Sequence, residues 1–198
     1  MKLFEQKSGS QKMRNFFFLL VIFICVVGTY YIYSSFNAKQ VVFENADGTK
    51  FPVNVSDFEN KEILNINTGT SESLSFKNSD YTLIILLSTG DCSSCLSERK
   101  IWSDFSKKYD TKKLQVAGVL IKSSVEEAKT LIKAFDFPFP VFFDEANQLS
   151  DFSQNLKVTP FKILLKNSGE VLLVDGPNPT LEAQRSFGEK VANKLLGN

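Results

Sequence analysis

The chain has 198 residues, of which 43% are hydrophobic and 23% charged, a composition that fits one ordinary globular domain with a short additional segment. Its 23 Lys and Arg residues are balanced by 22 Asp and Glu residues, so the basic excess that nucleic-acid binding requires is missing. Histidine is absent, which excludes histidine-activated nucleophiles and the usual catalytic zinc sites. We therefore expect no nucleic-acid partner, no metal and no other cofactor.

The amino-terminal region joins a basic tail to a long apolar run. Residues 15–38 carry no charge, and residues 16–36 are long enough to span a bilayer as a helix, which takes roughly 20 apolar residues. The tail, residues 1–15, has four Lys or Arg residues against one Glu, so the positive-inside rule predicts that it is cytoplasmic. A cleaved signal peptide is disfavoured by bulky Phe36. We expect an uncleaved single-pass anchor in the cell membrane, with the remaining chain on the extracytoplasmic face.

Residues 37–80 are expected to form a linker and an N-terminal hairpin extension. Two short apolar stretches within residues 41–55 flank an Asp-Gly pair, which is typical of tight hairpin turns. The polar sequence that follows predicts a second hairpin within residues 63–76, about a Thr-Gly pair.

Residues 81–198 form the predicted core, in which strands and helices alternate. Two apolar runs, residues 81–87 and 114–121, flank a helix predicted over residues 92–109, and a strand-helix-strand unit of this kind makes its strands parallel. The later patterns predict a helix after a capping box at Ser124, a strand over residues 141–143, a short helix over residues 149–156, a hairpin over residues 161–174, and a last helix that begins at Asn178 and Pro179. The fold class is therefore α/β with a mixed central sheet.

Cys92 and Cys95 form a Cys-Ser-Ser-Cys motif where the first apolar strand meets the long helix. A helix amino terminus has unpaired N–H groups and a positive dipole end, and both stabilise a thiolate on Cys92. Cys95, one turn further along, can then attack a mixed disulfide on Cys92 and release the partner in reduced form. A zinc half-site would lack further ligands, because the third cysteine, Cys25, lies in the predicted anchor. An inert local disulfide is the remaining structural alternative, and the pattern favours a redox dithiol.

Glu98 follows the second cysteine by three residues. Spacings of three, four, three and four place Cys95, Glu98, Trp102, Phe105 and Tyr109 on one face of the predicted helix. Desolvation on that face would raise the pKa of Glu98 and enable its carboxylate to take the proton of Cys95 during exchange. Alternatively, Glu98 lies at the rim of the helix and pairs with one of the two basic residues that follow it.

Thr159 and Pro160 precede the predicted hairpin. A proline immediately before a strand ordinarily marks the start of that strand, and the local sequence alone favours a trans peptide. By itself, the dipeptide therefore indicates a strand boundary and no chemistry.

The order of strand, CxxC, helix, strand, helix, strand, Thr-Pro, hairpin and final helix resembles the thioredoxin fold. It is most similar to the membrane-anchored thiol-disulfide reductases of the bacterial envelope, the TlpA and ResA type. The resemblance covers residues 41–195 and is carried by Cys92, Cys95, Glu98, Phe139-Pro140-Val141, Asp144 and Thr159-Pro160.

The resemblance implies that the Thr159–Pro160 peptide is cis and faces the disulfide, that Thr159 presents backbone to a substrate chain, and that Glu98 is the buried proton acceptor. It also implies that the protein reduces disulfide-bearing envelope proteins and receives electrons from a donor at the membrane. The chain departs from the family at Asp91, where an aromatic residue is usual, and it lacks a proline within or after the motif. Asp91 could cap the helix, but its charge opposes a thiolate on Cys92.

Two other functions compete with the reductase. A peroxiredoxin shares the fold and would use Thr89, three residues before Cys92, but Ile85 stands where it needs a proline. A noncatalytic thioredoxin-like binding module would hold the two cysteines in a static disulfide. Copper delivery is excluded, because it needs a histidine and a wider cysteine spacing.

Overall fold

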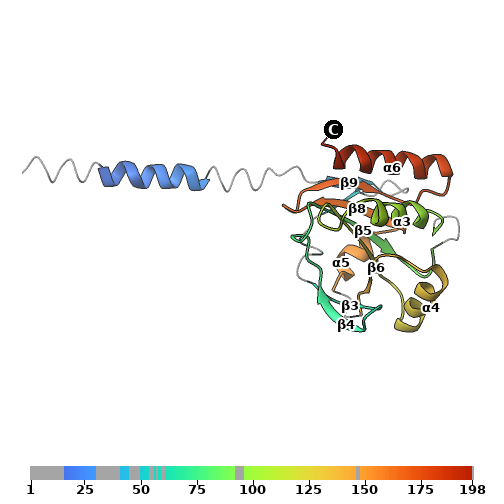
Figure 1. The fold of residues 1–198 in the computed structure, drawn as a ribbon. Helices are drawn as coiled ribbons and strands as arrows, with labels where there is room; N and C mark the ends of the chain where they lie inside the picture. The colour runs from blue at the N-terminus through green and yellow to red at the C-terminus, as the bar shows by residue number, and fades with distance from the viewer. Residues whose placement is uncertain are drawn as a thin grey trace, which may run out of the picture. The chain divides into compact units, whose positions relative to one another are not determined.

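The computed structural model describes residues 16–29, 41–44, 50–53, 56, 58, 61–91, 96–145 and 148–197 (Figure 1). The chain divides into two compact units, Met1–Gln40 and Val41–Asn198, and each is described by itself. In the first unit, residues 16–29 form a helix whose large apolar side chains are exposed. Within the described residues, no helix is both long and apolar enough to span a membrane. The rest of the predicted anchor, residues 30–36, and the tail, residues 1–15, lie outside the described residues.

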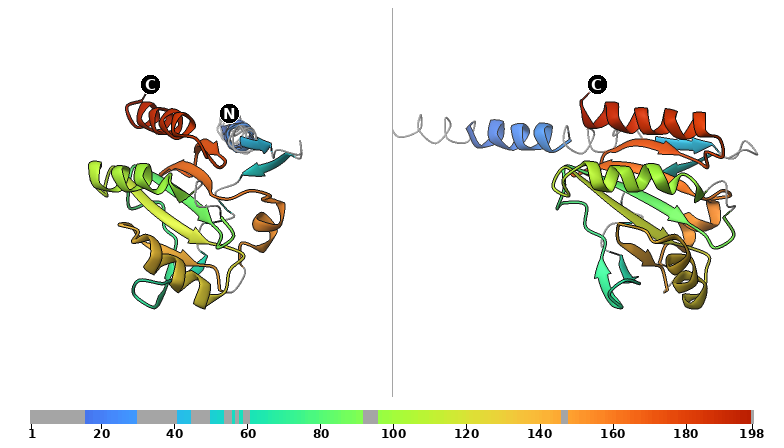
Figure 2. Two further views of the ribbon diagram at one scale, coloured as in Figure 1. Left: turned by 90° about the vertical axis from the view of Figure 1, so that its right-hand side faces the viewer. Right: turned by 45° about the vertical axis from the view of Figure 1, so that its right-hand side comes forward.

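The second unit is built on a mixed sheet that has, among the described residues, seven strands in the order β4-β3-β7-β6-β5-β8-β9 (Figures 1 and 2). These strands are β3 (Glu62–Asn65), β4 (Thr70–Ser73), β5 (Tyr81–Leu87), β6 (Leu114–Leu120), β7 (Val141–Phe143), β8 (Phe161–Lys166) and β9 (Val171–Asp175). β5 is parallel to β6 and β6 to β7, whereas β8 is antiparallel to both β5 and β9. The parallel pairing predicted for the two apolar runs is confirmed, and β5 lies inside the sheet.

The interior strands are apolar throughout because both faces of the sheet are covered. Successive side chains of a strand point to opposite faces, so Leu83 and Ile85 enter one core, whereas Ile84 and Leu86 enter the other. The same alternation on β8 sends Leu164 to the first core and Ile163 to the second.

The helices described in the second unit are α3 (Arg99–Lys108), α4 (Val125–Phe135), α5 (Ser150–Asn155) and α6 (Leu181–Leu195). Side chains of α3, α4 and α6 belong to the first core, and α5 contributes Phe152 to the second. α4 begins with the predicted capping box, in which Ser124 Oγ accepts from the Glu127 N–H and the Glu127 carboxylate accepts from the Ser124 N–H. The helices therefore cover the sheet on both sides.

Both hairpins predicted before residue 81 are present. β1 (Val41–Glu44) and β2 (Lys50–Val53) pair antiparallel in a separate two-stranded sheet, although their predicted turn lies outside the described residues. β3 and β4 form the second hairpin, and β3 also pairs antiparallel with β7. The second hairpin thus extends the central sheet.

Two helix boundaries differ from the predictions. The helix predicted over residues 92–109 is interrupted, because Ser97 and Glu98 form a turn before α3 begins at Arg99. The last helix is capped by Thr180, whose hydroxyl accepts from the Ala183 N–H at 3.2 Å, and not by Asn178. Asn178 is otherwise engaged, since its amide donates to the Asp175 carboxylate at 2.9 Å.

Candidate active site

The predicted cysteine pair lies between two well-defined elements. β5 ends at Leu87, and the chain is helical at Leu96. Cys92 and Cys95 fall within residues 92–95, outside the described residues. Their predicted position at a strand-to-helix junction therefore stays a prediction. The side chains on either side of the junction are described, and they define the site.

Glu98 is wholly buried at the start of α3, with an exposed fraction of 0%. Trp102 and Phe105, which share its predicted face, are buried as well. Both carboxylate oxygens of Glu98 accept hydrogen bonds from Lys162 Nζ, each at 2.9 Å. The alternative that Glu98 lies at the rim beside a neighbouring basic residue is therefore wrong.

Lys162 is the partner that the sequence did not reveal. It is the second residue of β8, it is also 0% exposed, and its ammonium group donates to the Gly176 carbonyl in addition to Glu98. The ammonium group lies 4.8 Å from the centroid of the Phe187 ring on α6, within the range of a cation–π contact. The sequence signal that could have indicated this partner is the position of Lys162 inside an otherwise apolar strand. A lysine that is fully buried there requires a partner for its charge.

Burial dominates the electrostatics of this ion pair. It raises the pKa of Glu98, while the charge and hydrogen bonds of Lys162 and a hydrogen bond with Asn178 act in the opposite direction. Burial also lowers the pKa of Lys162, and the charges of Glu98 and Asp175 oppose that change. Each member of the pair therefore favours the ionised form of the other and opposes the effect of desolvation.

The segment after β9 encloses the ion pair from the side of α6. Gln184 Nε2 donates to Ser97 Oγ at 2.7 Å and to the Asn178 carbonyl at 2.9 Å, which connects the turn before Glu98 to the start of α6. Gln184 and Asn178 are buried polar residues. These contacts fix the turn in which Glu98 lies.

The Thr159–Pro160 peptide is cis, as the resemblance implied. The Thr159 hydroxyl donates to Asp91 Oδ1, and Asp91 Oδ2 accepts from the Ser88 N–H at 3.0 Å. Burial raises the pKa of Asp91, and these two hydrogen bonds oppose the rise. The structure thus joins the loop that precedes the cysteines to the loop that carries the cis-proline.

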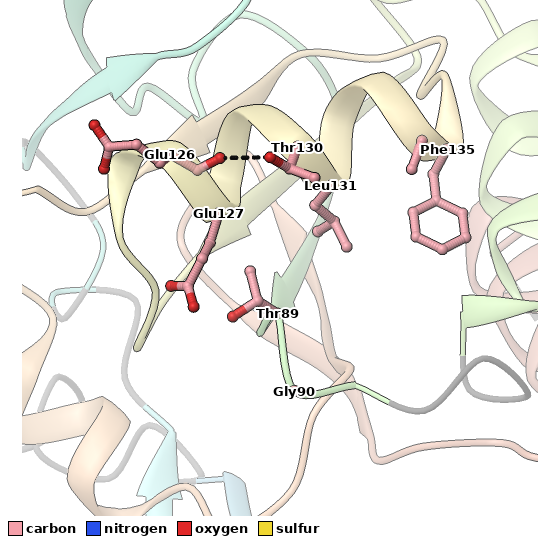
Figure 3. A pocket seen from close by; sticks show the side chains of 8 residues that line it. Thr89, Gly90, Glu126, Glu127, Thr130, Leu131 and Phe135 are labelled. Atoms are coloured by element: carbon pink, nitrogen blue, oxygen red, sulfur yellow. Dashed lines mark hydrogen bonds between the residues drawn. The ribbon is translucent and has the colours of Figure 1, made fainter.

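Two depressions border the loop after β5. One, of about 390 Å³, is lined by residues that include Asp91, Lys122, Lys157 and Thr159. The other, of about 620 Å³, lies between that loop and α4, where Glu127 and Leu131 project toward Thr89 (Figure 3). Among the described residues, no group of three or more acidic or cysteine side chains could hold a metal ion.

The fold is thioredoxin-like, and solved structures with this fold are similar to most of the chain. No protein-family model and no curated protein sequence matches the chain. StoA from Bacillus subtilis has a TM-score of 0.51 and 18% identity, over 66% of this chain and 95% of that one. A secreted disulfide oxidoreductase of Mycobacterium tuberculosis, described as homologous to E. coli DsbE, has a TM-score of 0.53 and 12% identity, over 67% and 95%.

A third similar structure covers more of the chain. A Chlorobium tepidum protein proposed to be the thiol:disulfide interchange protein DsbE has a TM-score of 0.53 and 17% identity, over 80% of this chain and 94% of that one. The second and third of these structures are described as a disulfide oxidoreductase and as a thiol:disulfide interchange protein. At these identities the likeness establishes the fold, and the resemblance seen in the sequence is confirmed at that level.

Proposed function

We propose that this chain is a thiol-disulfide oxidoreductase that reduces disulfides in proteins outside the cytoplasm through Cys92 and Cys95. The observation that supports it most is Glu98: a carboxylate three residues after Cys95 is completely buried and held by Lys162. A carboxylate is rarely buried without a reason, and strongly perturbed carboxylates are frequent at catalytic sites. The cis peptide at Pro160 is a second feature on which the family resemblance and the structure agree.

The proposed reaction proceeds in two thiol-disulfide exchanges. The thiolate of Cys92 attacks one sulfur of the substrate disulfide, forming a mixed disulfide and releasing the first substrate thiol. Glu98 then takes the proton of Cys95, whose thiolate attacks the sulfur of Cys92 and expels the second substrate thiol. The substrate gains two electrons, and the protein is left with a Cys92–Cys95 disulfide. A donor at the membrane must return two electrons for another cycle.

We also propose that the protein acts at the outer surface of the cell membrane. The helix over residues 16–29 exposes a long series of large apolar side chains, which lipid would cover favourably. The basic tail before it favours a cytoplasmic amino terminus, and a thiol-disulfide enzyme finds disulfide substrates in an oxidising compartment. The M. tuberculosis protein with a similar fold is described as secreted.

The test is reduction of a protein disulfide by the full-length chain in detergent, with the release of substrate thiols as the measured signal. Starting from the reduced chain, we expect the wild type to reduce one substrate disulfide per Cys92–Cys95 dithiol and Cys92→Ala to reduce none. Cys95→Ser should accumulate a mixed disulfide, because that variant can attack but cannot resolve. Cys25→Ala is the matched control and should behave as wild type. Mass spectrometry of the trapped species would identify the substrate.

The same assay separates the competing functions. A binding module with a static disulfide would lose folding stability on reduction and would transfer no electrons. A peroxidase would consume peroxide, with Cys92 oxidised to a sulfenic acid. Full turnover in Cys92→Ala would contradict the proposed mechanism.

A further inference from the structure

We propose that Lys162 is a positioning residue for the second exchange, because its ammonium group fixes the Glu98 carboxylate in its ionised form and so prepares it to accept a proton. This inference rests on the proposed function for the identity of the proton donor, Cys95. The ion pair itself lies entirely among described residues.

The contacts around Lys162 Nζ indicate its protonation state. Its acceptors are the two oxygens of Glu98, each at 2.9 Å, and the Gly176 carbonyl oxygen. When Glu98 is ionised, these three acceptors match the three N–H donors of the ammonium form. The Phe187 ring at 4.8 Å favours the same form, because an aromatic face attracts a cation.

The contacts of Glu98 lead to the matching conclusion. Both of its oxygens accept from one ammonium group, and a protonated carboxyl would turn its own hydrogen toward one of those donors. Opposite an ammonium group, this geometry suits an ionised carboxylate although Glu98 is 0% exposed. An ionised carboxylate is what a proton acceptor requires.

The surroundings make Lys162 the group on which this state depends. Asp175 on β9 raises the pKa of Glu98, and Lys190 on α6 lowers the pKa of Lys162. On Glu98, Asp175 acts in the same direction as burial, and on Lys162, Lys190 does so, whereas the charge of Asp175 also raises the pKa of Lys162 and favours its ammonium form. Without the charge of Lys162, burial and Asp175 together would favour a protonated Glu98, which could not accept a proton.

The pair also has a role after the proton moves. When Glu98 takes the proton of Cys95, the ammonium charge of Lys162 is no longer balanced by a carboxylate. The thiolate of Cys95 then forms the new S–S bond with Cys92 and displaces the substrate sulfur. Lys162 thus acts through Glu98 and touches neither sulfur nor substrate in this scheme.

The test is the titration of the Glu98 carboxyl in the reduced full-length chain, by carbon NMR of labelled glutamate with Glu98→Gln for assignment. In the wild type we expect an ionised Glu98 at pH 7. In Lys162→Gln, which keeps a donor but removes the charge, the titration should move to higher pH. Lys166→Gln removes an exposed lysine of the same strand and should leave the titration unchanged.

Kinetics provide the second readout. In Lys162→Gln the resolution of the mixed disulfide should slow at least about tenfold at pH 7, since each unit that the pKa of Glu98 lies above the ambient pH lowers the ionised fraction about tenfold. The rate should recover as the pH is raised, which a purely structural defect would not produce. Lys162→Arg keeps the charge and should keep the wild-type pH profile if it folds.

Three results would overturn the inference. The first is a protonated Glu98 at pH 7 in the wild type, a result that does not depend on the folding of any variant. The second is an unshifted titration of Glu98 in Lys162→Gln. The third is a slowed resolution of the mixed disulfide in Lys162→Gln that higher pH does not restore. A wild-type chain that fails to reduce disulfides would instead contradict the proposed function, whatever the titration of Glu98. The two failures are therefore distinguishable.

Discussion

Glu98 shows what a single side chain contributes to this site. Its spacing from Trp102 and Phe105 correctly predicts that it faces the interior, and its exposed fraction of 0% confirms the prediction. Its partner, Lys162, lies 64 residues further along the chain and on a different element. Helical periodicity reports which face a residue is on, but it does not identify what packs against that face. The face of Glu98 was therefore predictable, whereas its ion pair was not.

Removing the charge of Glu98 should affect one step of the reaction. In Glu98→Gln we expect resolution of the mixed disulfide to slow roughly 100-fold, because a general base typically contributes that much, while the first attack by Cys92 stays nearly unchanged. Stopped-flow measurement of each half-step would show the difference, with Glu189→Gln on the exposed side of α6 as control. Equal resolution rates in Glu98→Gln and wild type would show that Glu98 is not the proton acceptor.

The same residue predicts a pH dependence in the wild type. Because burial raises the pKa of Glu98, its carboxylate is protonated at a higher pH than an ordinary glutamate. The resolution step should therefore slow as the pH falls through that pKa, and Glu98→Gln should lack this limb of the profile. If the resolution rate of Glu98→Gln still falls at low pH, the titrating group is a residue other than Glu98.

At the scale of elements, the site depends on contacts between loops that are distant in sequence. Asp91 follows β5 and Thr159 precedes β8, and their hydrogen bond connects the two loops. The sequence singled out both residues, but for separate reasons, since Asp91 appeared as a departure from the family and a possible helix cap. Local capping rules place an acidic residue at a helix start and do not reveal a partner on another strand.

The element boundaries differ from the predictions for a related reason. Asn178 and Pro179 form a good cap and first-turn pair, but the Asn178 amide donates to Asp175, so Thr180 caps α6. The apolar runs of β5 and β6 were predictable almost to the residue, because strands buried on both faces have a strong pattern. Local sequence rules give the wrong role to polar side chains, such as Asn178, that bond to residues of another element near the site.

Breaking the connection between the two loops should destabilise the fold in a pH-dependent way. In Thr159→Val the Asp91 carboxylate loses a donor, and we expect the free energy of unfolding to fall by about 1 kcal/mol at neutral pH. The Thr159 hydroxyl opposes the rise in the pKa of Asp91, so its loss raises that pKa further. The variant should therefore be less destabilised at acid pH, where Asp91 is protonated in both proteins.

Urea unfolding at several pH values would measure this difference. Thr111→Val, at an exposed threonine, is the matched control and should cost little at any pH. A destabilisation by Thr159→Val that does not change with pH would show that the hydroxyl does not act through the Asp91 charge.

For the whole molecule, the sheet divides the second unit into two cores, and the Glu98–Lys162 pair lies beside the first of them. The core beneath α3 and α6 contains Trp102 and Phe187, and the Phe187 ring lies 4.8 Å from the Lys162 ammonium group, whereas the opposite core is closed by α5 and by side chains of the β1–β2 hairpin. Alternation along the strands predicts that two cores exist, because strands apolar on both faces must be covered twice. It does not predict that Glu98 meets Lys162 on this side of the sheet, which depends on the turn at Ser97 and Glu98 before α3.

The location of the molecule is predicted from its other unit. An apolar helix over residues 16–29 follows a basic tail, and large exposed apolar surfaces are unfavourable in water. If the segment anchors the chain with its amino terminus in the cytoplasm, protease added to spheroplasts should digest the second unit and leave the tail intact. Lysed spheroplasts are the control, in which the tail is digested too.

Replacing the four basic residues of the tail by Gln should weaken the orientation, because these charges retain the tail in the cytoplasm. A second unit that resists protease until lysis would show that the orientation is reversed or that the chain stays inside the cell.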